Sequence, residues 1–192
     1  NGDAQLIERV AGRTFRLSSG SFWQAHKAAP ELLTGCVKEF ADLLGFASEK
    51  QNLDLYSGVG LFSATLSNSY PGAKFLAVES AKQALEDGER STQDLPNLKF
   101  HKADVLKFLR SQAAGSFDTI VLDPPRSGAA NKVVEQLIRL QPRNLIYVAC
   151  DPVALARDLK TLGGAGYSMK AIRAFDIFPH THHFETVVAL SR

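Results

Sequence analysis

The chain of 192 residues fits a single domain and is long enough to bury roughly two thirds of the surface that it exposes when unfolded. Its 45% hydrophobic and 22% charged residues are typical of a folded protein, and its net charge of +2 permits a nucleic-acid partner without the dense basic patch of a protein that grips RNA alone. No apolar run approaches the ~20 residues of a membrane span, no signal peptide is visible and the two cysteines lie far apart, so we expect a reducing, cytoplasmic location and no membrane partner.

Short apolar runs alternate with amphipathic segments along the whole chain. This pattern predicts helices at residues 26–44, 61–69, 81–92, 105–113, 131–140 and 152–162. It predicts strands at residues 51–56, 74–79, 98–101, 117–122, 144–149, 168–175 and 184–190. Strands 117–122 and 144–149 are apolar on both faces, as central parallel strands are.

The expected fold is therefore α/β, a Rossmann-like doubly wound sheet that is mostly parallel. A short loop rather than a helix joins the last two strands, which predicts an antiparallel edge strand. We expect one catalytic domain, with an N-terminal extension and helix in residues 1–46 and the Rossmann-like core in residues 47–192. Ligands of such sheets bind at the carboxyl ends of the strands, so the residues that follow each strand are the candidates for function.

A glycine-containing loop follows the first predicted core strand. Gly58 and Gly60 allow a close approach of the backbone to a ligand, and Glu79 ends the second strand nineteen residues later (79 − 60), where an acid can bind ribose hydroxyls. A tight turn with a surface carboxylate is the alternative. A nicotinamide cofactor is disfavoured, because the third glycine of that fingerprint falls at Ser63.

Two further carboxylates follow strands. Asp104 can contact an adenine amino group or simply cap the next helix. Asp123 begins an Asp-Pro-Pro-Arg run in which two prolines fix the backbone, so its carboxylate projects rigidly over the edge of the sheet. Arg126, at the end of this run, can hold a phosphate or a base edge. A proline-stiffened turn without a ligand is the alternative.

Cys150 ends the fifth core strand, directly before a predicted helix that Asp151 caps and Pro152 begins. The helix dipole lowers the pKa of a thiol in this place, whereas the charge of Asp151 opposes that shift. An isolated cysteine on an apolar strand is usually a small buried hydrophobe, but the position of Cys150 at a carboxyl end favours a catalytic role. Cys36 lies in an amphipathic helix and is expected in the core.

The segment before the last strand contains three histidines, His180, His182 and His183, followed by Glu185. A metal site is disfavoured because no third ligand has a recognisable spacing, so we expect no metal and a role for the histidines in shaping a pocket or contacting phosphate. Apolar neighbours would raise the pKa of Glu185, which suits a general base. A solvated carboxylate at the start of a strand is the alternative.

These residues together resemble the RNA uracil-5-methyltransferase family, and the similarity covers nearly the whole chain. Its motifs are matched by Phe22-Trp23-Gln24, by the loop 54–60, by Glu79 and Asp123, by residues 147–159 and by residues 178–185. The resemblance implies S-adenosylmethionine as the cofactor, held by Gln24, Tyr56, Gly58, Glu79 and Asp123, with Asp104 as a further candidate contact. It implies Cys150 as the nucleophile and Glu185 as the base in the methylation of uracil carbon 5 in transfer or ribosomal RNA.

The chain departs from the family at several positions. The usual Ser-Cys-Asn-Pro reads Ala-Cys-Asp-Pro around Cys150. Family members usually carry an N-terminal RNA-binding domain, and some carry an iron–sulfur cluster; neither is in this chain. Because the first residue is Asn1 rather than Met, we expect this to be the catalytic half of a longer protein.

Two other functions remain open. One is a methyltransferase of exocyclic amines in which Cys150 is structural, and the other is a silent RNA- or nucleotide-binding module. We favour uracil over cytosine, because cytosine-5 enzymes carry a cysteine at the place of Arg126. The sequence indicates no obligate protein partner.

Overall fold

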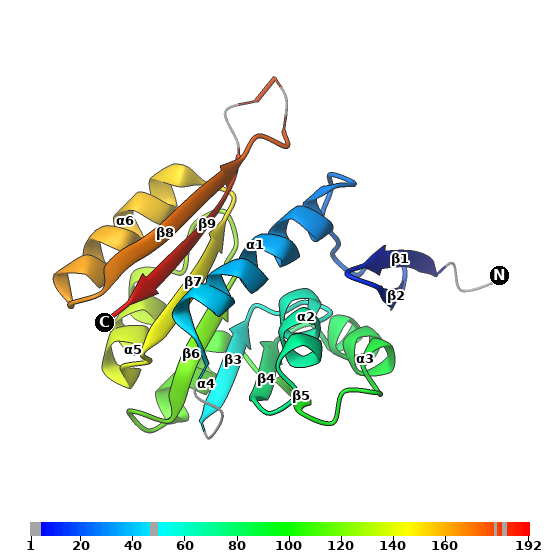
Figure 1. Cartoon of the computed structure of the whole chain (residues 1–192), viewed down its shortest axis with the longest axis horizontal. Helices are drawn as coiled ribbons and strands as arrows, with labels where there is room; N and C mark the ends of the chain where they lie inside the picture. Colours follow the sequence, from blue (N-terminus) through cyan, green and yellow to red (C-terminus); the bar gives the residue numbers. More distant parts are fainter. Residues whose placement is uncertain (1–4, 47–49, 179, 182–183) are drawn as a thin grey trace.

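A computed structural model describes residues 5–46, 50–178, 180–181 and 184–192. Its centre is a seven-stranded sheet in the order β5-β4-β3-β6-β7-β9-β8 (Figure 1). The strands are β3 (Gln51–Leu55), β4 (Lys74–Glu79), β5 (Leu98–Lys102), β6 (Phe117–Leu122), β7 (Asn144–Ala149), β8 (Ser168–Phe175) and β9 (Glu185–Ser191).

The strand directions confirm the expected fold class. Strands β3 to β7 pair in parallel, whereas β9 pairs antiparallel with both β7 and β8. The strand order reverses between β3 and β6, so the carboxyl ends of these two strands border the crevice where ligands of such folds bind.

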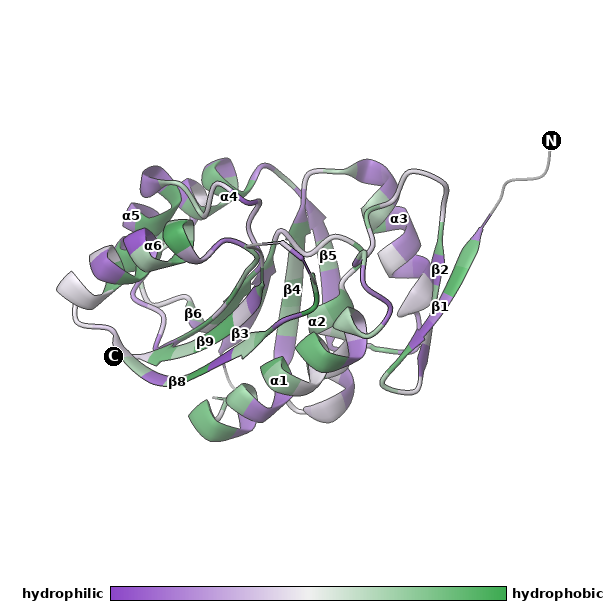
Figure 2. Ribbon diagram, turned by 90° about the horizontal axis from the view of Figure 1, so that it is seen from above, coloured by the Kyte–Doolittle hydropathy of each residue, from purple (hydrophilic) through white to green (hydrophobic). Residues whose placement is uncertain are grey.

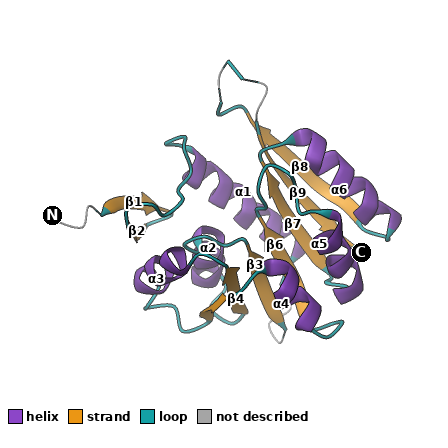
Figure 3. Cartoon of the chain, turned by 180° about the vertical axis from the view of Figure 1, so that it is seen from behind, coloured by secondary structure: helices purple, strands orange, loops and turns teal. Residues whose placement is uncertain are grey.

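Helices cover both faces of the sheet. One face carries α1 (Ala29–Leu44), α2 (Leu61–Ser69) and α3 (Lys82–Ser91), and the other carries α4 (Val105–Ser111), α5 (Asn131–Leu140) and α6 (Pro152–Gly164). Figure 2 shows α1 and α2 on one side of the sheet and α4, α5 and α6 on the other, and Figure 3 shows the second layer from behind.

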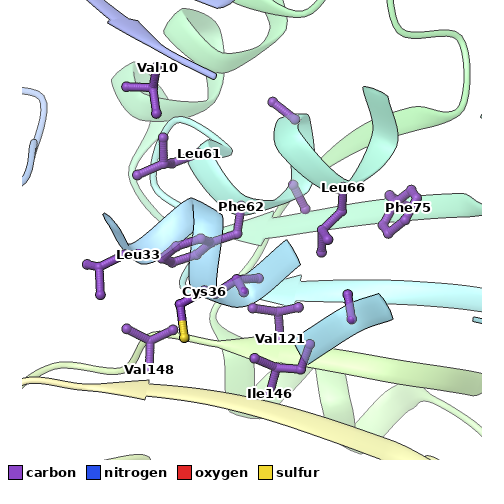
Figure 4. Packing of buried hydrophobic residues seen from close by; sticks show 14 of the residues in the cluster. Val10, Leu33, Cys36, Leu61, Phe62, Leu66, Phe75, Val121, Ile146 and Val148 are labelled. Atoms are coloured by element: carbon purple, nitrogen blue, oxygen red, sulfur yellow. The ribbon is translucent and has the colours of Figure 1, made fainter. Parts of the chain in front are cut away.

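The side chains of each central strand alternate between two hydrophobic cores. Val148 contributes to the core beneath α1 and α2, and Tyr147 to the core beneath α5 and α6. This double burial explains why β6 and β7 have no solvent-facing side. Cys36 lies in the first core beside Leu33 and Val148, with 2% of its surface exposed, which confirms the expected core position (Figure 4).

The N-terminal region differs from the prediction. A hairpin of β1 (Leu6–Val10) and β2 (Arg13–Leu17) was not predicted, and the first helix begins at Ala29 rather than at residue 26. The hairpin turn needs two positive φ angles, at Ala11 (49°) and Gly12 (79°), and an alanine gives no sequence signal for such a turn. The helix begins late because Pro30 occupies its first turn and residues 26–29 form a separate turn, in which the Ala29 amide donates to the His26 carbonyl.

None of the helices in the described part of the chain combines the length and the apolar character that crossing a membrane requires.

Gly88 of α3 provides a test of the packing. A Cβ atom there would lie 2.6 Å from the Phe100 ring and 2.8 Å from the Val59 carbonyl oxygen, whereas a Cβ at Gly35 of α1 would meet nothing within 4 Å. We expect Gly88→Ala to lower the free energy of unfolding by about 1–3 kcal/mol through overpacking. Gly35→Ala, the matched control, should raise it by roughly 0.5–1 kcal/mol. Urea denaturation measures both, and equal effects would show that the contact between α3 and Phe100 is not tight.

Candidate functional site

A cavity of about 550 Å³ opens at the carboxyl ends of β3, β4, β6 and β7. Its volume lies in the range of sites for cofactors and small ligands. It is lined by residues 20–24, residues 56–59, Leu61 and Phe62, Glu79 with the start of α3, residues 123–126, Cys150 and Glu185.

The loop after β3 has an unusual backbone conformation. Tyr56, Gly58 and Gly60 all have positive φ angles, of 59°, 53° and 78°. The Ser57 amide donates to the Val78 carbonyl over 3.2 Å and the Gly60 amide donates to the Ser57 carbonyl over 2.8 Å, so the loop is held against β4 as it enters α2. A glycine at position 60 is also required by space, since a Cβ would lie 2.8 Å from the Phe100 ring.

Glu79 is held rigidly at the end of β4. Its Oε2 accepts from the Gly58 amide at 3.0 Å, and its Oε1 accepts from the amides of Ser80 and Ala81 at 2.7 and 2.8 Å. The carboxylate therefore connects the glycine loop to the start of α3 while it lines the cavity.

Asp54 lies beneath the loop and is almost fully buried. Its Oδ2 accepts from the Ser63 amide at 2.9 Å, whereas its Oδ1 has no hydrogen-bond partner among the described residues. Burial raises the pKa of Asp54 to about 7, against the lowering effect of the Ser63 hydrogen bonds. The hydroxyl of Ser57, a residue of the loop that lines the cavity, is likewise buried without a partner in the described structure.

Strand pairing brings Cys150 and Glu185 together. In the antiparallel pair of β7 and β9, Ala149 lies opposite Thr186. One further step in this register places Cys150 opposite Glu185, although the two residues are distant in sequence. Both residues line the cavity.

The chemistry around Cys150 is acidic. Burial raises the pKa of the Cys150 thiol, and the charges of Glu185 and Asp123 raise it further, while Arg126 lowers it. Burial also raises the pKa of Glu185, again opposed by Arg126. The pKa of Asp123 lies well above its usual value because of burial and the neighbouring charges of Glu185 and Asp54. The site therefore favours protonated groups until positive charge enters it.

A side chain caps the amino end of α6, where the helix dipole is expected to lower the pKa of the Cys150 thiol. Asp151 accepts from the Ala154 amide at 2.7 Å, so one of the free amides at the start of α6 is satisfied by a side chain. Whatever the dipole contributes at Cys150, the direction of its pKa shift is upward.

The segment at residues 18–24 forms one wall and is fixed by α3. Asp87, with no exposed surface, accepts from the Ser18 amide at 2.7 Å and from the hydroxyls of Ser18 and Ser21 at 2.8 and 2.7 Å. After the residues that bond to Asp87, Trp23 packs against the Phe15 ring, and Phe22 is 72% exposed while it lines the cavity. Sequence reasoning did not find Asp87, because one aspartate within a charged helix carries no signal.

The structure gathers all but one of the expected site residues around the cavity: Gln24, Tyr56, Gly58, Glu79, Asp123, Cys150 and Glu185. Asp104 is not among the lining residues, and its carboxylate instead caps α4 by accepting from the Lys107 amide at 2.9 Å. His180 is exposed in a turn with a φ angle of 66°, and His182 and His183 lie outside the described residues. Within the described ranges, no three metal-ligating side chains cluster.

S-adenosylmethionine fits these donors. Its ammonium and sulfonium charges outweigh its carboxylate, and this net positive charge would offset the acids Asp123 and Glu185 that line the cavity. Ser57 lines the cavity, and its buried hydroxyl, unpartnered among the described residues, is a polar group that a ligand or water would satisfy. Glu79, at the end of β4, is placed to accept from ribose hydroxyls.

Comparison with known families and proteins agrees with this site. Residues 28–146 match the methyltransferase small domain, and residues 113–192 match the tRNA (uracil-5-)-methyltransferase family. Two proteins described as uncharacterized RNA methyltransferases, from Streptomyces avermitilis and Thermotoga maritima, are 43% and 36% identical over 99% and 98% of this chain, and the matches cover 43% and 42% of those proteins.

The crystal structure of Pyrococcus abyssi tRNA (uracil-54, C5)-methyltransferase in complex with S-adenosyl-L-homocysteine superposes with a TM-score of 0.80 at 31% identity. It covers 99% of this chain, and the chain covers 45% of that protein. The chain thus spans less than half the length of these relatives. The family resemblance, the fold and the S-adenosylmethionine cofactor are confirmed at this level, and the chain belongs to the tRNA uracil-5-methyltransferase family of RNA methyltransferases.

Proposed function

We propose that this chain is the catalytic domain of an enzyme that methylates carbon 5 of uracil in a transfer or ribosomal RNA, through a covalent bond between Cys150 and the base. The observation that supports this most is the register of β7 and β9, which puts a thiol and a carboxyl side by side at the cavity that the glycine loop borders. The Pyrococcus abyssi relative is a tRNA (uracil-54, C5)-methyltransferase.

The reaction needs a nucleophile because carbon 5 of uracil does not attack a methyl donor unaided. The Cys150 thiolate adds to carbon 6, and the electrons of the 5,6 double bond move onto the carbonyl oxygen at carbon 4 as an enolate. S-adenosylmethionine supplies the methyl group that carbon 5 then takes. Glu185 removes the proton from carbon 5, the double bond re-forms and the bond between sulfur and carbon 6 breaks.

Neighbouring residues also affect the protonation of Cys150 and Glu185. A carboxyl with a raised pKa, such as Glu185, holds a proton more strongly and is therefore a better base when it is ionised. Arg126 opposes the upward pKa shifts of both Cys150 and Glu185, so it favours the thiolate and carboxylate forms that the reaction requires. Arg126 is exposed, which leaves its guanidinium accessible to a phosphate or a base edge.

The target uracil must flip out of an RNA helix to reach this cavity, because the thiol and the proton-accepting carboxylate both have to approach its ring. Phe22, exposed at the cavity, offers an aromatic surface to such a ring. The alternatives of amine methylation and of silent binding are separated from the proposal by the experiments that follow.

Cofactor binding tests the role of the glycine loop. Glu79→Ala removes the acceptor of three backbone amides and of the expected ribose hydroxyls. We expect it to weaken the binding of S-adenosylhomocysteine by roughly 1.5–3 kcal/mol, the range for hydrogen bonds to charged groups. Calorimetry measures the affinity, and Glu89→Ala on the exposed side of α3 is the control that should bind normally. Normal binding by Glu79→Ala would contradict the assignment of this acid.

Covalent chemistry tests the roles of Cys150 and Glu185 separately. Cys150→Ala should form no adduct with RNA, because the attacking sulfur is gone. Glu185→Gln should form the adduct and transfer methyl but stall, since elimination needs the carbon 5 proton removed. A protein–RNA band that survives denaturant should therefore accumulate with Glu185→Gln and be absent with Cys150→Ala, in the intact protein with an RNA that it methylates.

The matched control is Cys36→Ala, which removes a thiol from the core and should preserve methylation. Near-normal methylation by Cys150→Ala would make that cysteine structural and favour an amine-methylating enzyme. Loss of methylation in both site variants with no adduct in either would reassign Glu185, and cofactor binding without any methyl transfer by the intact protein would favour a binding module.

A further inference from the structure

The loop after β6 packs against α6 and is hydrogen-bonded to it. Gly128 in this loop has a φ angle of 82°, and a Cβ there would lie 2.5 Å from Arg157 Nη2 and 2.7 Å from Asp158 Oδ2. The loop backbone thus passes directly over two side chains of α6, at a distance that only glycine permits.

Asp158 is the centre of the contact. It is 1% exposed, and its Oδ2 accepts from the Tyr147 hydroxyl at 2.8 Å and from the Ala129 amide at 2.9 Å. Its Oδ1 accepts from Arg157 Nε at 3.0 Å, and Arg157 Nη2 donates to the Ser127 carbonyl at 2.8 Å. The Ala129 amide also approaches the Tyr147 hydroxyl oxygen at 3.0 Å.

These bonds join the segment that carries Cys150 to the loop that carries Asp123 and Arg126. Tyr147 belongs to β7, which ends one residue before Cys150, and Asp158 belongs to α6, which begins two residues after Cys150. The loop that they hold begins with Asp123 and Arg126, the cavity residues that act electrostatically on the thiol. The buried carboxylate of Asp158 therefore bonds both to β7, which precedes the nucleophile, and to the loop after β6.

We propose that Asp158 is a positioning residue for methyl transfer: it fixes residues 123–130 against β7, so that Arg126 and Asp123 stay aligned with Cys150. This rests on the proposed function of Cys150. A buried carboxylate is costly to desolvate and contributes little stability by itself, so its value here is the single arrangement that its bonds impose. Misplacement of catalytic groups by about 1 Å costs up to about a hundredfold in rate.

Asp118 provides a matched control. It is 3% exposed and paired with Arg143 at 2.9 Å, as Asp158 is paired with Arg157, but it lies at the amino end of β6, away from the cavity. Asp118→Asn and Asp158→Asn both replace a buried, arginine-paired carboxylate. They differ in which end of β6 they loosen.

The experiment compares these variants and Tyr147→Phe in the intact protein, at a temperature where each is folded. We expect Asp158→Asn to lower kcat about 10–100-fold. The alkylation of its Cys150 by iodoacetamide should also follow a changed pH profile, because the charges of Asp123 and Arg126 no longer lie where they act on the pKa of the thiol. Peptide mass spectrometry follows Cys150 specifically. Tyr147→Phe, which removes only a hydroxyl, should change both readouts in the same direction but less.

Asp118→Asn should leave kcat and the alkylation profile unchanged. If Asp158→Asn and Tyr147→Phe alter kcat and alkylation no more than Asp118→Asn does, Asp158 is only structural and the inference is wrong, while the function of Cys150 stands. If Cys150→Ala methylates normally, the proposed function fails and this inference fails with it.

Discussion

The site depends on one pairing, the antiparallel alignment of β9 beside β7. A parallel sheet alone would bring the ends of β3, β4, β6 and β7 to one edge, which is enough for a cofactor cavity. It would not bring a base from the C-terminal part of the chain. The reversed strand β9 starts at that edge with Glu185, so one further step in the register places this carboxyl opposite Cys150, which follows β7. A one-residue slip in this register would turn Glu185 toward the opposite face of the sheet.

Charged groups at this edge of the sheet set the protonation of the site. Asp54, Asp123 and Glu185 concentrate carboxyl groups in a buried region, and burial raises the pKa of each. Arg126 opposes these upward shifts at Glu185 and at the Cys150 thiol, and under the proposed function the positive charge of the cofactor would act in the same direction.

Sequence reasoning recovers the sheet because its strands are short apolar runs between amphipathic helices. It also locates Cys150, Asp123 and Glu79, since each directly follows or ends a strand and their convergence is a consequence of topology. The sequence does not predict the hairpin of β1 and β2, because Ala11 adopts a positive φ angle that alanine rarely takes. It does not predict the roles of Asp87 and Asp158 either, because their bonds reach residues far away in sequence. For Asp104 the sequence offers both a ligand contact and a helix cap, and the structure shows the cap on α4.

The covalent role of Cys150 is the central claim, and 5-fluorouridine tests it most directly. RNA that carries 5-fluorouridine at the target position has no proton on carbon 5, so the reaction cannot proceed past the methylated adduct. Digestion of the trapped complex followed by mass spectrometry should find a methylated fluorouridine nucleotide attached to the peptide that contains Cys150. A nucleotide attached to a different residue, or complete absence of a trapped complex with RNA that the intact protein otherwise methylates, would contradict a mechanism through Cys150.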